Sequence, residues 1–167
     1  MTRSTRSLAT FAAALVLAAG SLAAHASGRA EVRYADPARF TDAGFGPTEL
    51  ARTQRTLSAH IERLAATLPD GQLLRVEVRD IDLAGELEMF ALDRVRVLGR
   101  VPDRPRLDLA FELLAGDTVL HRGETVLTEL GYLDRGIGPR RANEPLVHER
   151  RLLDRWFAER IAPAAAQ

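Results

Sequence analysis

The fold is decided by residues 74–79, which are Leu-Arg-Val-Glu-Val-Arg. Apolar and charged side chains alternate along this stretch, and a period of two is typical of a β-strand with one buried and one solvated face. A second such run covers residues 107–113, in which every odd-numbered residue is apolar and Asp108 and Glu112 are charged. Both runs predict strands of a sheet that is covered on one side only.

Three further segments have strand character. Residues 32–35 predict a short strand that Asp36-Pro37 ends, because proline cannot donate to a ladder. Val95 and Val97 alternate with arginines and predict another strand. Residues 118–130 follow the turn signal Ala115-Gly116-Asp117, so we expect them to form a hairpin with residues 107–113.

Two helices are predicted. The first covers about Thr48 to Leu68, where apolar residues form one stripe at a period of 3.6, and Pro69-Asp70-Gly71 stops it. The second follows a glycine-rich loop over residues 131–142, with Asn143 as N-cap and Pro145 in the first turn. It carries Trp156 on its apolar side, and we expect Pro163 to end it.

The order β-α-β-β-β-β-α predicts an α+β fold. The economical arrangement is an antiparallel sheet of about four to five strands with both helices packed on one face. The sense of the first strand stays open. We expect the other face to be solvated and lined by charged side chains, namely Arg75, Glu77, Arg79, Arg94, Arg96, Asp108 and Glu112.

Residues 1–26 have the pattern of an export signal. Arg3 and Arg6 precede an apolar run from Leu8 to Ala19, and Ala24-His25-Ala26 resembles a cleavage site. An uncleaved membrane anchor is the alternative, but the run is shorter than the roughly 20 residues that cross a bilayer. We expect a periplasmic protein that begins at Ser27, with no stable membrane insertion after cleavage.

The remaining residues, 27–167, are long enough for a single domain with its own core. They contain 21 basic and 23 acidic residues, so the composition gives no basis for binding nucleic acid. The chain has no cysteine and no lysine, which excludes thiolate chemistry, a Schiff base and a P-loop. No dinucleotide-binding or zinc-protease motif is present. We expect no cofactor, and the residue types favour a non-enzymatic protein.

The densest polar stretch is residues 80–88, Asp-Ile-Asp-Leu-Ala-Gly-Glu-Leu-Glu. Asp80 and Asp82 share one face of an extended segment, and Glu86 follows a glycine that lets the chain fold back. Three carboxylates are suitable ligands for Ca²⁺ or Mg²⁺, and they also supply the acid and base of a hydrolase. The simpler interpretation is that they end a strand and pair with Arg75, Arg79, Arg94 and Arg96.

A second polar group contains Asp36, Thr41 and Asp42, for which turn and cap roles are favoured. The tentative binding residues are therefore Asp36, Asp42, Asp80, Asp82 and Glu86. His60, His121 and His148 lie on three different predicted elements and at no ligand spacing, so we do not expect a histidine metal site.

Several segments resemble a bacterial family of exported proteins known as domain of unknown function 3016. The resemblance is carried by Val32-x-Tyr34-x-Asp36-Pro37-x-x-Phe40-Thr41-Asp42, Leu68-Pro69-x-Gly71-Gln72, Val76-x-Val78-x-Asp80-Ile81-Asp82-Leu83-Ala84-Gly85-Glu86, Pro105-Arg106-Leu107-x-Leu109 and the terminal helix with Trp156. It covers the chain after the export signal. The resemblance implies an exported bacterial protein and no particular chemistry.

Three functional hypotheses follow. The first is a non-enzymatic periplasmic binding or envelope-accessory protein that contacts an envelope protein or a polar ligand. The second is a carboxylate-dependent hydrolase or a divalent-metal-binding domain centred on Asp80, Asp82 and Glu86. The third is a homodimer built through sheet edges or through the solvated face, although no coiled-coil heptad favours it.

Overall fold

The computed structural model describes residues 27–90, 93–99, 104–134, 136 and 144–166, and the side chains of residues 89, 90, 93 and 94 lie outside the description. The predicted export signal and the predicted cap Asn143 also lie outside it. In chain order, the elements are β1 (Arg29–Tyr34), η1 (Pro37–Arg39), α1 (Gly46–Ala65), β2 (Gln72–Asp82), β3 (Glu86–Phe90), β4 (Asp93–Val97), β5 (Arg106–Ala115), β6 (Thr118–Thr128), α2 (Val147–Trp156), η2 (Phe157–Ile161) and α3 (Ala162–Ala165).

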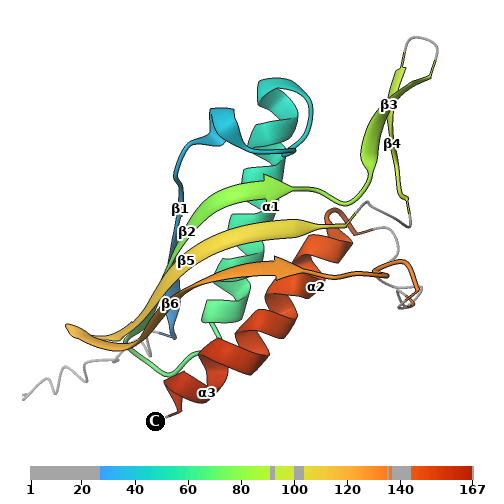
Figure 1. Cartoon of the computed structure of the whole chain (residues 1–167). Helices are drawn as coiled ribbons and strands as arrows, with labels where there is room; N and C mark the ends of the chain where they lie inside the picture. The colour runs from blue at the N-terminus through green and yellow to red at the C-terminus, as the bar shows by residue number, and fades with distance from the viewer. Residues whose placement is uncertain (1–26, 91–92, 100–103, 135, 137–143, 167) are drawn as a thin grey trace, which may run out of the picture.

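The main sheet has four strands in the order β1-β2-β5-β6 (Figure 1). The α+β class is confirmed, but the prediction of an antiparallel sheet is wrong for β1, which runs parallel to β2. A parallel neighbour is possible because α1 carries the chain back between the two strands. The β5–β6 pair is the predicted hairpin, turning at Gly116 and Asp117.

The predicted strand at Val95 and Val97 exists but is not part of this sheet. It is β4, which pairs antiparallel with β3 in a separate two-stranded hairpin. Figure 1 shows this hairpin projecting from one end of the main sheet. Val95 and Val97 are exposed, so their alternation does not mark a face of the main core. Arg94 and Arg96, which were expected on the solvated face of the main sheet, therefore belong to β4 and lie outside that sheet.

One extra residue interrupts the pairing of β2 with β5. Val78 lies opposite Leu109 and Asp80 lies opposite Asp108, which leaves Arg79 without a place in the ladder. Such a β-bulge shifts the alternation of all following residues by one. Consequently the buried side chains of β2 are even-numbered from Leu74 to Val78, whereas Ile81 is the buried one beyond the bulge.

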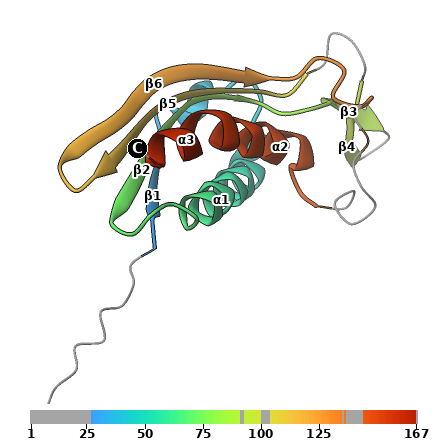
Figure 2. The same ribbon diagram turned by 90° about the horizontal axis from the view of Figure 1, so that it is seen from below.

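The helices cover one face of the main sheet, as predicted, and Figure 2 shows them on its concave side. The core between these layers contains Leu57 and Ile61 of α1 and the inward residues of β2 and β5. Trp156 packs edge-to-face on Phe111, with ring centroids 5.3 Å apart. Tyr34 joins β1 to α1, because its hydroxyl donates to the carbonyl of Gln54 at 2.7 Å.

The last helix differs from the prediction at both ends. It begins at Val147, after Leu146 in a left-handed conformation, so Pro145 precedes the helix. It also passes Pro163 and continues to Ala165. In a regular helix, the ring of Pro163 would clash with the carbonyl of an earlier residue. The π turn Phe157–Ile161, which is wider than a regular helical turn, stands just before Pro163. Within the described residues, no helix has the length and apolar content needed to cross a membrane.

His60 ties α1 to α2 and is buried between them. Its Nε2 lies 2.6 Å from Oδ1 of Asp154, and its Nδ1 accepts hydrogen bonds from Arg63 and Arg150. Two donors aimed at Nδ1 leave no room for a proton there, so the ring is neutral with its proton on Nε2. Burial is the largest cause of a lowered pKa of His60; Arg150 and Arg63 also lower it, and together they outweigh the opposite effect of Asp154.

The lowered pKa of His60 predicts a loss of stability in acid. Below about pH 6.5 the unfolded chain binds a proton at this histidine and the folded chain does not, so acidification favours unfolding. We expect the free energy of unfolding to fall more steeply with decreasing pH in the wild type than in His60→Gln, by at most about 1.4 kcal/mol per pH unit.

Urea unfolding of both proteins between about pH 5 and 7 measures this difference. His121 and His148 are present in both proteins, so the comparison isolates His60. Equal slopes for the wild type and His60→Gln would contradict a neutral buried ring.

Candidate functional site

The segment after β1 returns to the end of β2 and extends the parallel ladder there. The backbone N–H of Asp42 donates to the carbonyl of Ile81 at 2.8 Å, and the N–H of Leu83 donates to the carbonyl of Asp42 at 3.0 Å. Asp42 and Asp82 thereby lie side by side in a parallel bridge. This return brings together two polar groups that are about 40 positions apart in the sequence.

Asp80 is held by bonds to three groups. Thr41 donates to it from its backbone N–H at 2.8 Å and from its hydroxyl at 2.9 Å. Arg106 donates to Oδ2 of Asp80 at 2.6 Å and to Asp108 at 3.2 Å. Asp80 and Asp108 are directly opposite in the ladder, where like charges repel, and the guanidinium of Arg106 neutralises both.

Asp42 is held by Arg96 of the projecting hairpin. Arg96 makes a two-pronged bond to its carboxylate, with N–O distances of 2.8 and 3.0 Å, and also donates to the carbonyl of Gly85 at 2.5 Å. Both charged side chains are about three-quarters buried, with 24% of each exposed. This geometry is the strong, directional form of an ion pair, so it fixes the β3–β4 hairpin against the end of the sheet.

Gly85 permits this close approach. Its φ is +85°, and a Cβ at this position would lie 2.7 Å from the carbonyl oxygen of Val97. On the other side of the same connection, the buried carboxylate of Glu149 accepts a hydrogen bond from the N–H of Ala84 at 2.7 Å. The hairpin is therefore fixed to the sheet on one side and to α2 on the other.

A cleft of about 560 Å³ lies between the hairpin and the end of the sheet. We call it the hairpin cleft, and its lining residues are Thr41, Asp42, Asp82, Leu83, Gly85, Glu86, Leu87, Arg104 and Arg106. Glu86 and Arg104 are both exposed, and neither has an ion-pair partner among the described residues. Within the described residues, the cleft thus offers a ligand one negatively charged side chain, Glu86, and one positively charged side chain, Arg104.

Four of the five predicted binding residues gather at this place. Asp42, Asp82 and Glu86 line the cleft, and Asp80 lies beside it through Thr41 and Arg106. Asp36 does not line it: this residue is exposed and precedes η1, where its carbonyl accepts from the N–H of Arg39. Within the described residues, no group of three histidine, aspartate or glutamate side chains is arranged to hold a metal ion.

Of the acidic stretch that was expected to pair with arginines, Asp80 does so, but with none of the expected partners, and Glu86 has no ion pair among the described residues. Asp80 pairs with Arg106, which the sequence analysis did not consider, and Asp42 pairs with Arg96. The buried Glu149 was also missed. The bulge at Arg79 is visible in the sequence, because the apolar residues change from even to odd numbers between Val78 and Ile81.

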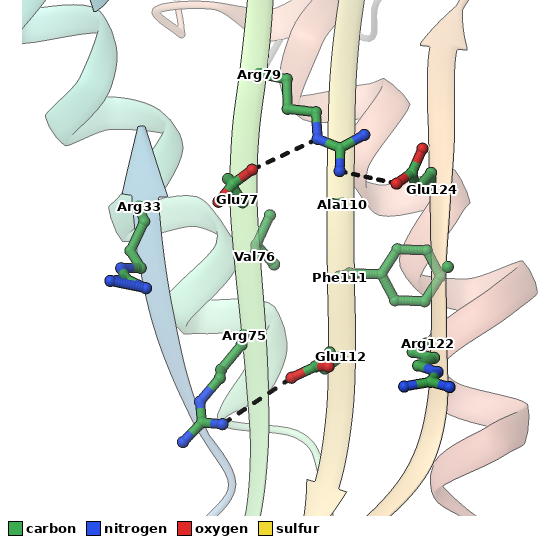
Figure 3. Close-up of a pocket in the computed structure, with 11 residues that line it drawn as sticks. Arg33, Arg75, Val76, Glu77, Arg79, Ala110, Phe111, Glu112, Arg122 and Glu124 are labelled. Carbon is green, nitrogen blue, oxygen red and sulfur yellow. Dashed lines mark hydrogen bonds and ion pairs between the residues drawn. The ribbon is translucent and has the colours of Figure 1, made fainter. Parts of the chain in front are cut away.

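The solvated face of the main sheet contains a second candidate site (Figure 3). This open-face hollow of about 550 Å³ is lined by Arg33, Arg75, Val76, Glu77, Arg79, Ala110, Phe111, Glu112, Arg122, Gly123 and Glu124. Arg79, the bulge residue, bonds Glu77 and Glu124 on either side. These bonds raise the pKa of Arg79, and the bond to Glu124 lowers the pKa of that carboxyl.

Charges on this face alternate across the strands. Arg75 contacts Glu31 on one side and Glu112 on the other. Arg33 and Arg122 stand at the two sides of the hollow, and neither has a hydrogen bond or ion pair among the described residues (Figure 3). The face is therefore largely neutralised by its own pairs, and in the described part of the chain Arg33 and Arg122 remain as unpaired cations, one on each edge strand.

These features define an α+β domain with one covered sheet face, one charged face and a fixed hairpin beside a polar cleft. The family model "Protein of unknown function (DUF3016)" matches residues 28–159, so the chain belongs to this family, as the resemblance implied. No curated protein and no solved structure matches the chain.

The Asp42–Arg96 pair predicts a measurable cost of its removal. In Arg96→Gln, the partly buried carboxylate of Asp42 loses its charged partner, and we expect the free energy of unfolding to fall by about 2 kcal/mol. Amide hydrogen exchange in residues 84–98 should also become faster, because the hairpin loses one of its two anchors.

Urea unfolding measures the first effect and exchange followed by mass spectrometry the second. Arg104→Gln is the matched control, since it removes an exposed arginine of the same cleft and should change stability by less than about 0.5 kcal/mol. Equal losses in the two variants would show that Arg96 does not anchor the hairpin.

Proposed function

We propose that this chain is an exported, non-enzymatic binding protein that contacts a partner in the cell envelope through the hairpin cleft. The observation that carries the proposal is the cleft itself. Its walls are fixed by the Asp42–Arg96 and Glu149–Ala84 contacts, while Glu86 and Arg104 at its surface are left available. A preformed cavity with a few available polar groups is the usual form of a binding site.

The same contacts weigh against a carboxylate-dependent hydrolase that uses Asp42 or Asp80. A hydrolase of this type needs two carboxylates free to act as acid and base or nucleophile. The oxygens of Asp42 and Asp80 already accept bonds from arginines and from backbone N–H groups. Such bonds occupy the oxygens that a nucleophile, a general base or a metal ligand would need. Asp42 and Asp80 therefore have structural roles in this proposal.

The partner we propose is an extended protein segment with side chains of both charges. The cleft volume of about 560 Å³ suits a few residues of such a segment. Glu86 would pair with a basic side chain and Arg104 with an acidic one. Leu83 and Leu87 add an apolar part to the lining, against which the stems of such side chains would pack.

Export supports a partner in the envelope. The basic residues, apolar run and cleavage pattern of residues 1–26 favour secretion, and the family match begins only at residue 28. A protein that works outside the cytoplasm has little access to nucleotide cofactors. The missing phosphate-binding and dinucleotide-binding motifs are consistent with such a location.

Site-specific photo-cross-linking in living cells tests the proposal. A photoreactive amino acid replaces Leu87, which lines the cleft, in the full chain with its own N-terminal segment. We expect one defined adduct with an envelope protein. Its yield should fall several-fold when Glu86→Arg is added, because the substitution reverses the available charge.

The matched control places the same photoreactive group at Arg55, an exposed position on α1 that is not part of the cleft. Cross-linking at Arg55 should give no adduct of that mass. The proposal fails if Leu87 and Arg55 give the same adducts, or if Glu86→Arg leaves the Leu87 adduct unchanged.

A further inference from the structure

The strand β6 is an edge of the main sheet. It is 11 residues long, pairs with β5 on one side, and has no strand partner on its other side among the described residues. Edge strands are usually protected from pairing by lysine, proline, a β-bulge or shortness. The strand contains no lysine and no proline; it has a bulge at Leu120, and beyond the bulge residues 121–128 pair regularly with β5. It carries three exposed apolar side chains, Val119, Leu120 and Val126. An edge of this kind is suited to pair with another strand.

The sequence of β6 is complementary to itself. If a second copy pairs antiparallel with Gly123 opposite the partner's Gly123, then Arg122 lies opposite the partner's Glu124. By the two-fold symmetry, Glu124 lies opposite the partner's Arg122.

Both charged residues are available for this contact. Arg122 has no hydrogen bond or ion pair among the described residues, and both residues are exposed on the open face (Figure 3). The side chain of Glu124 is 68% exposed and bonds Arg79 through Oε1 only. Its second oxygen remains to accept a bond from the partner's Arg122.

Charge also selects this register over its neighbours. Moving the two-fold axis to residue 122 would place Arg122 opposite the partner's Arg122, and moving it to residue 124 would place Glu124 opposite the partner's Glu124. Like charges directly opposite each other destabilise a strand pair. Gly123 lies on the two-fold axis and adds no side chain where the two backbones approach. The space that a side chain at Gly123 would enter is already bounded by the ring of Phe111.

We propose that this protein is a homodimer in which the β6 strands of two copies pair antiparallel about Gly123 and join the two sheets into one of eight strands. The dimer depends only on the β6 edge. It is independent of the hairpin cleft, which lies at the end of the sheet beside β3 and β4.

Light scattering coupled to size-exclusion chromatography of the protein expressed from its full sequence tests the dimer. We expect the wild type to have the mass of two chains. Arg122→Glu and Glu124→Arg each place like charges opposite each other twice, so each should raise the dimer dissociation constant by about tenfold or more.

Mixing the two variants provides the decisive step. In a heterodimer of Arg122→Glu with Glu124→Arg, both opposed pairs again carry opposite charges, so the mixture should recover the dimer mass. The double variant with both substitutions should recover it too. Loss of the Arg79–Glu124 bond within one chain cannot be repaired by mixing, so recovery separates the interface from a folding defect.

Arg33→Glu is the matched control, because Arg33 is also an exposed cation without a partner but lies on the opposite edge strand. It should stay dimeric. A monomeric wild type would overturn the proposal. So would single variants that remain dimeric like the wild type, or a mixture that remains monomeric.

Discussion

The extra residue Arg79 in β2 controls which side chains of this protein meet solvent and which meet the core. Before it, Val76 and Val78 face the helices; beyond it, Ile81 takes the buried position. Without the bulge, the regular alternation of a strand would turn Asp80 and Asp82 toward the core. Two unpaired carboxylates there would cost several kcal/mol each. The bulge therefore makes the acidic stretch compatible with a folded sheet.

The charged contacts follow from this face change. Asp80 turns toward Arg106 and Thr41, and the parallel return of the chain places Asp42 beside Asp82. Asp42 then holds Arg96, which fixes the hairpin and closes one side of the cleft. Arg79 itself, displaced from the ladder, reaches Glu77 and Glu124 on the open face. One irregular residue thus links both candidate sites.

The local patterns in the sequence predicted a large part of the fold. Alternation over residues 74–78 and 107–113 predicted β2 and β5, and the helical stripe around Leu57 and Ile61 predicted α1. The sense of β1 could not be predicted, because a strand followed by a helix can pair in either direction. The position of β4 was predicted wrongly, since alternation marks a strand but not the sheet to which the strand belongs.

The candidate site was predictable only in part. Asp80, Asp82 and Glu86 lie close together in sequence, so their proximity followed from local geometry. The pair Asp42–Arg96 joins residues 54 positions apart, and a long flexible side chain such as arginine has many possible partners at that range. Glu149 accepts a hydrogen bond from the N–H of Ala84, and these two residues are 65 positions apart. Only the folded chain selects these contacts.

The pairing of β2 with β5 in solution tests this account most directly, and inter-strand nuclear Overhauser effects between backbone protons measure it. A bulge at Arg79 predicts contacts of Asp80 with Asp108 and of Ile81 with Leu107. A regular ladder would instead place Arg79 opposite Asp108 and Asp80 opposite Leu107. Observation of the regular set would contradict the face change on which the cleft and the charged face depend.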